Sequence, residues 1–132
     1  MVPSPRLNVV DSSAWLAYLA DESGAAQFAV AIEDVMHLVV PTVCLFEVFK
    51  VVVRQRDERD ALQAVAVIQQ GTVVDLDAAL ALSAARLSGV YKLPLADSVV
   101  YATMQPVGGV LWTQDVDFSG LPDVQYIPKS PR

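Results

Sequence analysis

The stretch Asn8-Val9-Val10-Asp11-Ser12-Ser13 decides the fold, because the sequence pattern changes there from strand to helix. Its first half is apolar and β-branched, which predicts a short buried strand. Ser12 or Ser13 can cap a following helix that carries Trp15, Leu16 and Leu19 at helical spacing. Asp11 would then lie at the carboxyl end of a strand, where parallel α/β sheets bind ligands. A helix cap is the simpler explanation of Asp11 alone, so a functional site requires other acids that meet it.

The rest of the chain alternates short β-branched runs with helical patterns. The expected strands are 7–11, 37–40, 72–76, 110–113 and 124–127. The expected helices are 13–19, 25–34, 42–56, 61–70, 78–90 and 93–104. This alternation predicts a mainly parallel sheet in an α/β/α sandwich. The length of 132 residues predicts a single domain, 1–132, with a loose leader at 1–6 and a tail at 128–132.

Local signals place the boundaries of these elements. Pro41 should end the second strand, and Thr42 should cap the long helix after it. The charged run 56–60 is expected to be a solvated connection between helices, and His37 a residue at the edge of the second strand.

Composition excludes several classes of protein. Cys44 and His37 are each the sole residue of their type, which excludes a disulfide framework and a Cys/His zinc site. No apolar run reaches membrane-spanning length, and the N-terminus lacks the pattern of a signal peptide, so we expect a cytoplasmic protein without a membrane partner. A net charge of −6 argues against a general nucleic-acid coat protein but is compatible with an acidic metal site that acts on nucleic acid.

The apolar content is high for so small a chain. Hydrophobic residues make up 54% of the sequence, and the mean hydropathy is +0.42. The surplus predicts contacts with another subunit or partner. The helix around Phe46 and Phe49 is the first candidate for such a surface.

Three acids fall where a parallel sheet would gather them. Asp11 ends the first strand, Asp115 follows the fourth, and Asp97 lies in the first turn of the helix before the fourth. Glu47 is a fourth candidate, because its helix is apolar almost all round except for a stripe formed with Lys50 and Arg54. A carboxylate in a buried helix costs free energy unless it is paired or binds a metal.

Each acid also has a structural explanation. Asp97 could complement a helix dipole, and Glu47 could pair with Lys50 one turn away. Asp115 and Asp117 could be turn residues before the next apolar side chain. Four separate caps and pairs explain the set less easily than one shared site does.

The acids stand in motifs with a recognisable order. These are Val-Val-Asp11-Ser-Ser, Pro41 followed by Glu47, Leu-Ala-Asp97-Ser-Val-Val-Tyr-Ala, and Thr113-Gln114-Asp115-Val-Asp117-Phe118. Over nearly its whole length the chain resembles the PIN-domain ribonucleases, and most of all the VapC-type toxins of bacterial toxin–antitoxin pairs. The resemblance implies a PIN-like sandwich with a five-stranded sheet in the order 3-2-1-4-5. Asp11 and Asp115 would then meet on neighbouring strands.

The resemblance also implies residue roles. Asp11, Glu47, Asp97 and Asp115 match the family's catalytic acids and would bind Mg²⁺ or Mn²⁺, for which an all-oxygen ligand set is suited. Ser13 and Thr113 match supporting hydroxyl positions. Asp117 is either an auxiliary metal ligand or a loop acid, and Gln114 stands where relatives often carry a basic residue.

The implied activity is that of a metal-dependent endoribonuclease toxin that leaves 5′-phosphate and 3′-hydroxyl ends. Its partners would be an RNA substrate, a cognate antitoxin and a second copy in a homodimer. Lys50, Arg54 and Arg86 are candidates for RNA contact, although they could equally be structural. Two alternatives remain: a catalytically silent PIN-like module that binds a partner, and a metal-dependent phosphatase of another α/β fold. One common phosphatase type needs a second Asp where Ser13 stands.

Overall fold

One five-stranded parallel sheet organises the computed structural model, which describes residues 6–130. The strands lie in the order β3-β2-β1-β4-β5, which confirms the expected topology. Their bounds are β1 Asn8–Val10, β2 Leu38–Pro41, β3 Thr72–Val74, β4 Val110–Thr113 and β5 Val124–Tyr126. The first, third and fifth strands are shorter than expected from the sequence. Parallel pairing joins all four neighbouring pairs of strands, so every strand ends at the same edge of the sheet.

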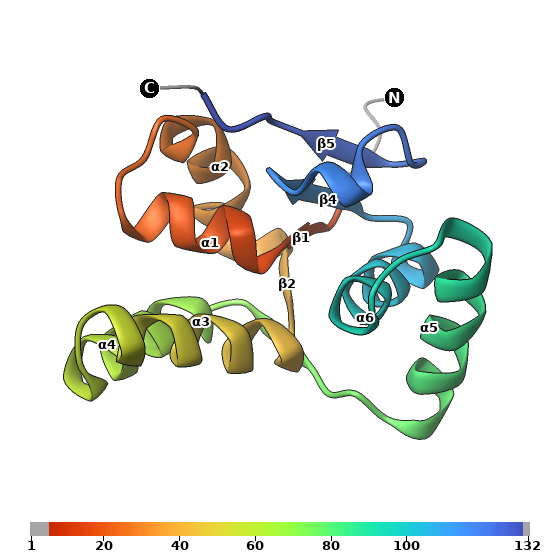
Figure 1. Cartoon of the computed structure of the whole chain (residues 1–132), viewed down its shortest axis with the longest axis horizontal. Coiled ribbons are helices and arrows are strands. Elements are labelled where there is room, and N and C mark those ends of the chain that lie inside the picture. Colours follow the sequence, from red (N-terminus) through yellow and green to blue (C-terminus); the bar gives the residue numbers. More distant parts are fainter. Residues whose placement is uncertain (1–5, 131–132) are drawn as a thin grey trace.

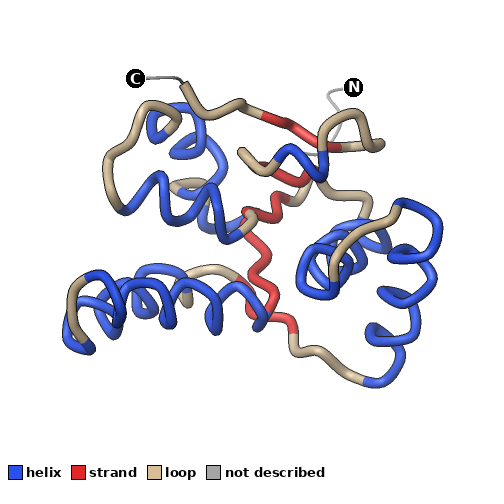
Figure 2. Tube along the Cα trace, viewed as in Figure 1, coloured by secondary structure: helices blue, strands red, loops and turns tan. Residues whose placement is uncertain are grey.

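Helices cover both faces of this sheet. They are α1 Ser12–Leu19, α2 Ala25–Ile32, α3 Thr42–Gln55, α4 Glu58–Ile68, α5 Ala78–Tyr91 and α6 Leu95–Met104, with short 3-10 helices η1 Val35–His37, η2 Gln105–Val107 and η3 Val116–Phe118. Figure 1 shows α1 to α4 on one side of the strands and α5 with α6 on the other. Figure 2 shows the strands running between these two helical layers. No helix formed by residues 6–130 is both long and apolar enough to span a membrane.

The central strand β1 is buried between the helical layers. Val9 and Val10 are fully buried, and the α1 side chain Trp15 and the α6 side chain Tyr101 are among the largest buried groups around them. Val10 pairs with Trp112 of β4, and the Asp11 amide donates to the Trp112 carbonyl at 3.0 Å. The ladder therefore continues to Asp11 and places this acid beside the end of β4.

The structure corrects the expected helix caps. Asp11, not a serine, is the N-cap of α1, and Pro41, not Thr42, is the N-cap of α3. Neither N-cap makes a side-chain hydrogen bond to its helix. Because Asp11 occupies the cap position, the hydroxyls of Ser12 and Ser13 do not cap the helix and donate hydrogen bonds to other side chains instead.

Two charged segments also differ from the sequence expectation. The run 56–60 is not only a connection, because α4 already begins at Glu58, and Asp57 caps it by accepting a hydrogen bond from the Asp60 amide at 2.7 Å. His37 is not in a strand but ends η1, where its Nδ1 lies 2.9 Å from an Asp34 carboxylate oxygen.

The helix α3 is less buried than its apolar sequence suggested. Only Cys44 and Val48 are fully buried, whereas Phe46 is 65% exposed and Val53 is 38% exposed. Periodicity cannot distinguish an apolar face that packs within the chain from one that remains at its surface. Of the expected terminal segments, residues 1–5 and 131–132 lie outside the described residues.

Candidate metal centre

Asp11 is the buried member of an acidic cluster at the carboxyl edge of the sheet. Its Oδ2 accepts hydrogen bonds from Ser13 Oγ at 2.7 Å and from Thr113 Oγ1 at 2.9 Å. Burial raises the pKa of the Asp11 carboxyl, these two hydrogen bonds lower it, and the charge of Asp115 raises it further. The expected pair of supporting hydroxyls therefore does orient this acid.

Asp115 and Asp117 lie in the turn that follows β4. The Asp115 amide donates to Thr113 Oγ1 at 2.9 Å, so one hydroxyl joins the ends of β1 and β4. Asp115 Oδ1 accepts a hydrogen bond from the Asp117 amide at 2.9 Å, which starts the 3-10 helix η3. Asp115 is therefore a turn residue, as one explanation from the sequence had it. The same turn also brings the Asp117 side chain toward the cluster.

Asp97 faces these acids from the first turn of α6. Carboxylate oxygens of Asp97, Asp115 and Asp117 lie within 4.8 Å of one another. Burial raises the pKa of Asp97 to about 7, with further contributions from the charges of Asp11, Asp115, Asp117 and Glu47. Each of the other four acids thus lies near enough to disfavour ionisation of Asp97.

Glu47 reaches the site from α3, which lies on the side of the sheet opposite to α6, the helix that carries Asp97 (Figure 1). Ser12 Oγ donates a hydrogen bond to Glu47 Oε1 at 2.6 Å. The pairing with Lys50 considered from the sequence does not form; Lys50 Nζ instead lies 5.8 Å from the centroid of the Phe46 ring. Sequence reasoning missed this role of Ser12, because its place before a helix indicated a cap.

The ligand atoms of the cluster suit a hard divalent cation. Among residues 6–130, no Lys, Arg or His forms an ion pair with Asp11, Glu47, Asp97, Asp115 or Asp117. Several carboxylates held together without a cationic side chain repel one another, and this repulsion adds to the effect of burial in raising the pKa of Asp97. Mg²⁺ and Mn²⁺ prefer such all-oxygen sites, so the residues present fit either ion.

The three candidate RNA-contacting residues lie outside the acidic cluster. Lys50 and Arg54 are exposed on α3, and Arg86 is exposed on α5. Two of them therefore share the helix that carries Glu47.

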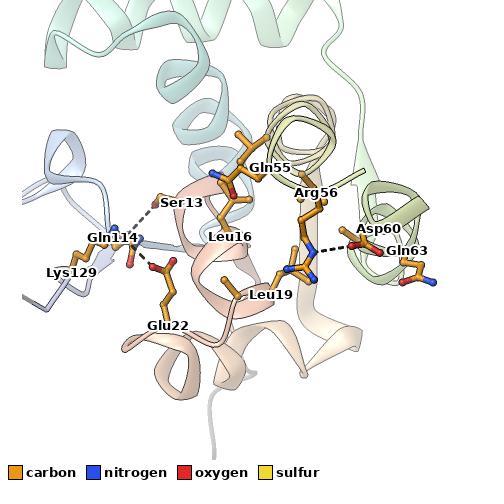
Figure 3. Close-up of a pocket in the computed structure, with 14 residues that line it drawn as sticks. Ser13, Leu16, Leu19, Glu22, Gln55, Arg56, Asp60, Gln63, Gln114 and Lys129 are labelled. Atoms are coloured by element: carbon orange, nitrogen blue, oxygen red, sulfur yellow. Dashed lines mark hydrogen bonds and ion pairs between the residues drawn. The ribbon is translucent and has the colours of Figure 1, made fainter. Parts of the chain in front are cut away.

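A groove with a volume of about 840 Å³ adjoins the cluster (Figure 3). It begins at Ser13 and Gln114, where the Gln114 amide donates to Ser13 Oγ at 3.2 Å, and continues between α1 and the α3–α4 pair. Apolar side chains such as Leu16 and Val52 line it, together with the ion pairs Arg56–Asp60 at 2.8 Å and Lys129–Glu22 at 3.9 Å.

A parallel α/β sheet in this order, with carboxylates at its carboxyl edge, defines a class of α/β/α domains with an acidic centre. The model of the PIN domain family matches residues 9–124, and the chain therefore belongs to this family. A search of curated proteins finds no significant match.

Solved structures share the fold at low sequence identity. A toxin–antitoxin complex from Klebsiella pneumoniae is 22% identical, with a TM-score of 0.73 over 91% of this chain and 99% of that one. VapC20 of Mycobacterium tuberculosis, a Sarcin-Ricin loop cleaving toxin, is 22% identical, with a TM-score of 0.75 over 92% and 99%. The DNA-bound VapBC of Salmonella typhimurium is 12% identical, with a TM-score of 0.71 over 94% and 98%.

Proposed function

We propose that this chain is a Mg²⁺- or Mn²⁺-dependent endoribonuclease that acts as the toxin of a toxin–antitoxin pair. The observation that carries the proposal is the gathering of acids that follow β1 and β4 and project from α3 and α6. Carboxylate oxygens of Asp97, Asp115 and Asp117 lie within 4.8 Å of one another. Burial raises the pKa of Asp97 to about 7, and the charges of Asp11, Glu47 and the other acids contribute to this shift. The similar structures include toxin–antitoxin complexes and a toxin that cleaves the Sarcin-Ricin loop, which supports a nuclease of this class.

In this proposal Asp11, Glu47, Asp97 and Asp115 hold the metal, and Asp117 is an auxiliary ligand. Ser13 and Thr113 keep Asp11 oriented before any ion binds, because each donates a hydrogen bond to the same carboxylate oxygen. A bound divalent ion would supply water activation and charge neutralisation at the scissile phosphate. Cleavage would leave a 5′-phosphate and a 3′-hydroxyl.

Recognition of RNA would depend on cationic side chains outside the acidic cluster. Lys50 and Arg54 are exposed on the helix that also carries Glu47, which supports a role for them in contacting phosphates next to the bond that is cut. Arg86 of α5 is the third candidate. These contacts would offset the repulsion between RNA and a chain with a net charge of −6.

The groove in Figure 3 is the proposed site of the antitoxin. It is partly apolar, carries charges of both signs and ends at Ser13 and Gln114 beside the acidic cluster. A peptide that fills it could extend a basic side chain toward the acids and block them. Because residue 114 is a glutamine, the proposed toxin has no cationic side chain of its own at this position that would compete with the peptide.

The proposal is tested by cleavage of a mixed RNA substrate with Mg²⁺, with Mn²⁺ and with EDTA. Asp11→Asn, Asp97→Asn and Asp115→Asn should each reduce metal-dependent cleavage about 100-fold or more, since loss even of groups that only support a metal's ligands costs 10- to 100-fold. Asp75→Asn is the control, because Asp75 lies in the exposed connection between β3 and α5 and should leave cleavage unchanged.

Expression in cells tests the toxin role separately. The wild-type chain should arrest growth when induced alone and not when its neighbouring small gene is co-expressed, and RNA ends mapped during arrest should identify the cleaved RNA. Folded wild-type protein that shows no metal-dependent cleavage, and that inhibits growth equally with and without its neighbour, would support the silent partner-binding module instead.

A further inference from the structure

We infer that Ser12 is a positioning residue that fixes the Glu47 carboxylate for metal binding. The inference rests on the proposed function, because it concerns the proposed metal centre. Ser12 touches neither the substrate nor the metal in this account, and it acts only through Glu47.

The hydroxyl of Ser12 is committed to this contact. Ser12 is the first residue of α1, is 8% exposed, and donates from Oγ to Glu47 Oε1 at 2.6 Å. That distance is in the range of a charge-assisted hydrogen bond between a hydroxyl and a carboxylate. A serine hydroxyl has one proton to donate, so the same group cannot also donate to another acid.

Glu47 stands apart from the acids that already face one another. Asp97, Asp115 and Asp117 already lie within 4.8 Å of one another, whereas Glu47 is outside that group and comes from α3. Within residues 6–130, the Ser12 bond is the only hydrogen bond to its carboxylate. A glutamate side chain loses considerable rotamer freedom when it is fixed, and fixing it before the metal arrives removes that cost from binding.

Hydrogen bonds tie down the backbone on both sides of the contact between Ser12 and Glu47. The preceding Asp11 continues the β1–β4 ladder, and the following Ser13 donates its hydroxyl to Asp11. The α3 side of the contact is anchored by Cys44, whose buried thiol donates to the Val10 carbonyl at 3.7 Å. Two adjacent serines thus orient one acid each: Ser13 holds Asp11, and Ser12 holds Glu47.

The test measures Mn²⁺ binding to the free protein by calorimetry, without RNA. Ser12→Ala should weaken Mn²⁺ affinity about tenfold, the lower end of the effect of a hydrogen bond to a charged group. Ser12→Cys keeps the size but donates only weakly, so it should behave like Ser12→Ala, whereas Ser12→Thr should restore affinity to nearly that of the wild type. Ser88→Ala is the matched control, because it removes a serine hydroxyl that donates at 2.7 Å to the Leu93 carbonyl, away from the acids.

A double-mutant cycle with Glu47→Gln identifies the route of the effect. Ser12→Ala should add little to the loss already caused by Glu47→Gln, since the two changes interrupt one contact. An equal added loss in the Glu47→Gln background would overturn the inference, because Ser12 would then act through the fold. Wild-type affinity in all the Ser12 variants would overturn it while the proposed function stands. A wild-type chain that binds no Mn²⁺ would overturn the proposed metal centre and the inference with it.

Discussion

At the scale of single residues, Asp97 links the proposed site to the stability of the fold. Its pKa is raised to about 7, whereas an unfolded aspartate has a pKa of about 4. Between these values the native state binds more protons than the unfolded chain. The contribution of Asp97 to stability is therefore present below about pH 4, falls as pH rises through this window, and stays lost above it.

The first prediction follows for the metal-free protein. Asp97→Asn should raise the melting temperature in EDTA at pH 8, and the gain should be smaller at pH 5 and absent near pH 4. The gain should be on the order of 1 kcal/mol, because solvent screening at this half-buried group reduces the full effect of the pKa shift. Thermal melts of the variant and of the Asp75→Asn control check it. A variant that melts below wild type at pH 8 would mean that Asp97 serves a structural hydrogen bond instead.

The second prediction separates Asp115 from its neighbour Asp117. The Asp115 carboxylate organises the turn by accepting the Asp117 amide, whereas the Asp117 side chain is exposed. Asp117→Asn should therefore reduce metal-dependent cleavage about tenfold, compared with about 100-fold or more for Asp115→Asn. Cleavage rates at saturating Mg²⁺ measure both. Equal losses would make Asp117 a full member of the metal centre.

Sequence reasoning at the residue scale was strongest where backbone position fixes a side chain. Asp11 and Asp115 follow neighbouring parallel strands, so the strand pattern, together with the strand order that the family resemblance implied, was enough to bring them together. The contact between Ser12 and Glu47 depends instead on how α3 packs beside α1. No local pattern encodes that packing, and the cap preference of serine favoured the wrong partner for the hydroxyl.

At the scale of elements, two glycines lie in contrasting surroundings, one crowded and one open. Gly71 connects α4 to β3, and a Cβ there would lie 2.8 Å from the Leu38 carbonyl oxygen at the start of β2. Gly89 lies inside α5, and a Cβ there would meet nothing within 4 Å. The two sites therefore differ in available space.

The third prediction uses this difference as a matched pair. Gly71→Ala should lower the free energy of unfolding by about 2 kcal/mol, as overpacking against backbone does. Gly89→Ala should raise it by roughly 0.5–1 kcal/mol, because alanine is the better helix former. Urea unfolding of both variants provides the measurement. Equal effects at the two positions would show that the α4–β3 connection shifts to make room for the added methyl group without a loss of stability.

Element type was easier to predict than element ends. Alternating β-branched runs and helical patterns located every strand and every α-helix, because the periodicity of a buried face extends over several residues. The start of α4 was wrong because Glu58 and Asp60 stabilise a first helical turn, which a charged run alone does not reveal.

At the scale of the whole molecule, apolar surface remains on α3 in the described chain. Phe46 is 65% exposed and lies beneath Lys50, and Val53 of the same helix is 38% exposed. The homodimer that the family resemblance implies would cover this surface. The sequence indicated a surplus of apolar residues and made the helix around Phe46 and Phe49 the first candidate for a partner surface. It could not tell which apolar residues of this helix face the interior, because a helix buried by its own chain and one buried by a second copy have the same pattern.

The fourth prediction concerns this surface. The wild-type chain should have twice the monomer mass of 14.2 kDa by light scattering, and Phe46→Asp should shift it to monomer. Val30→Asp is the control, because Val30 of α2 is similarly exposed, at 67%. A wild-type chain that is already monomeric, or a dimer that survives Phe46→Asp, would contradict a dimer through α3.

The strand order also determines when the cluster can form during synthesis. The central strand β1 is made first, but its partner β4 comes about a hundred residues later, as the separation of 102 between Asp11 and Thr113 shows. Until β4 leaves the ribosome, one edge of β1 has no neighbour, and long-range pairing of this kind folds slowly. Asp11 therefore stays apart from Asp97 and Asp115 until residues 97–115 have been made. The proposed nuclease would therefore acquire its activity only after β4 and the following Asp115 have been made, which would protect the message and the ribosome up to that point in synthesis.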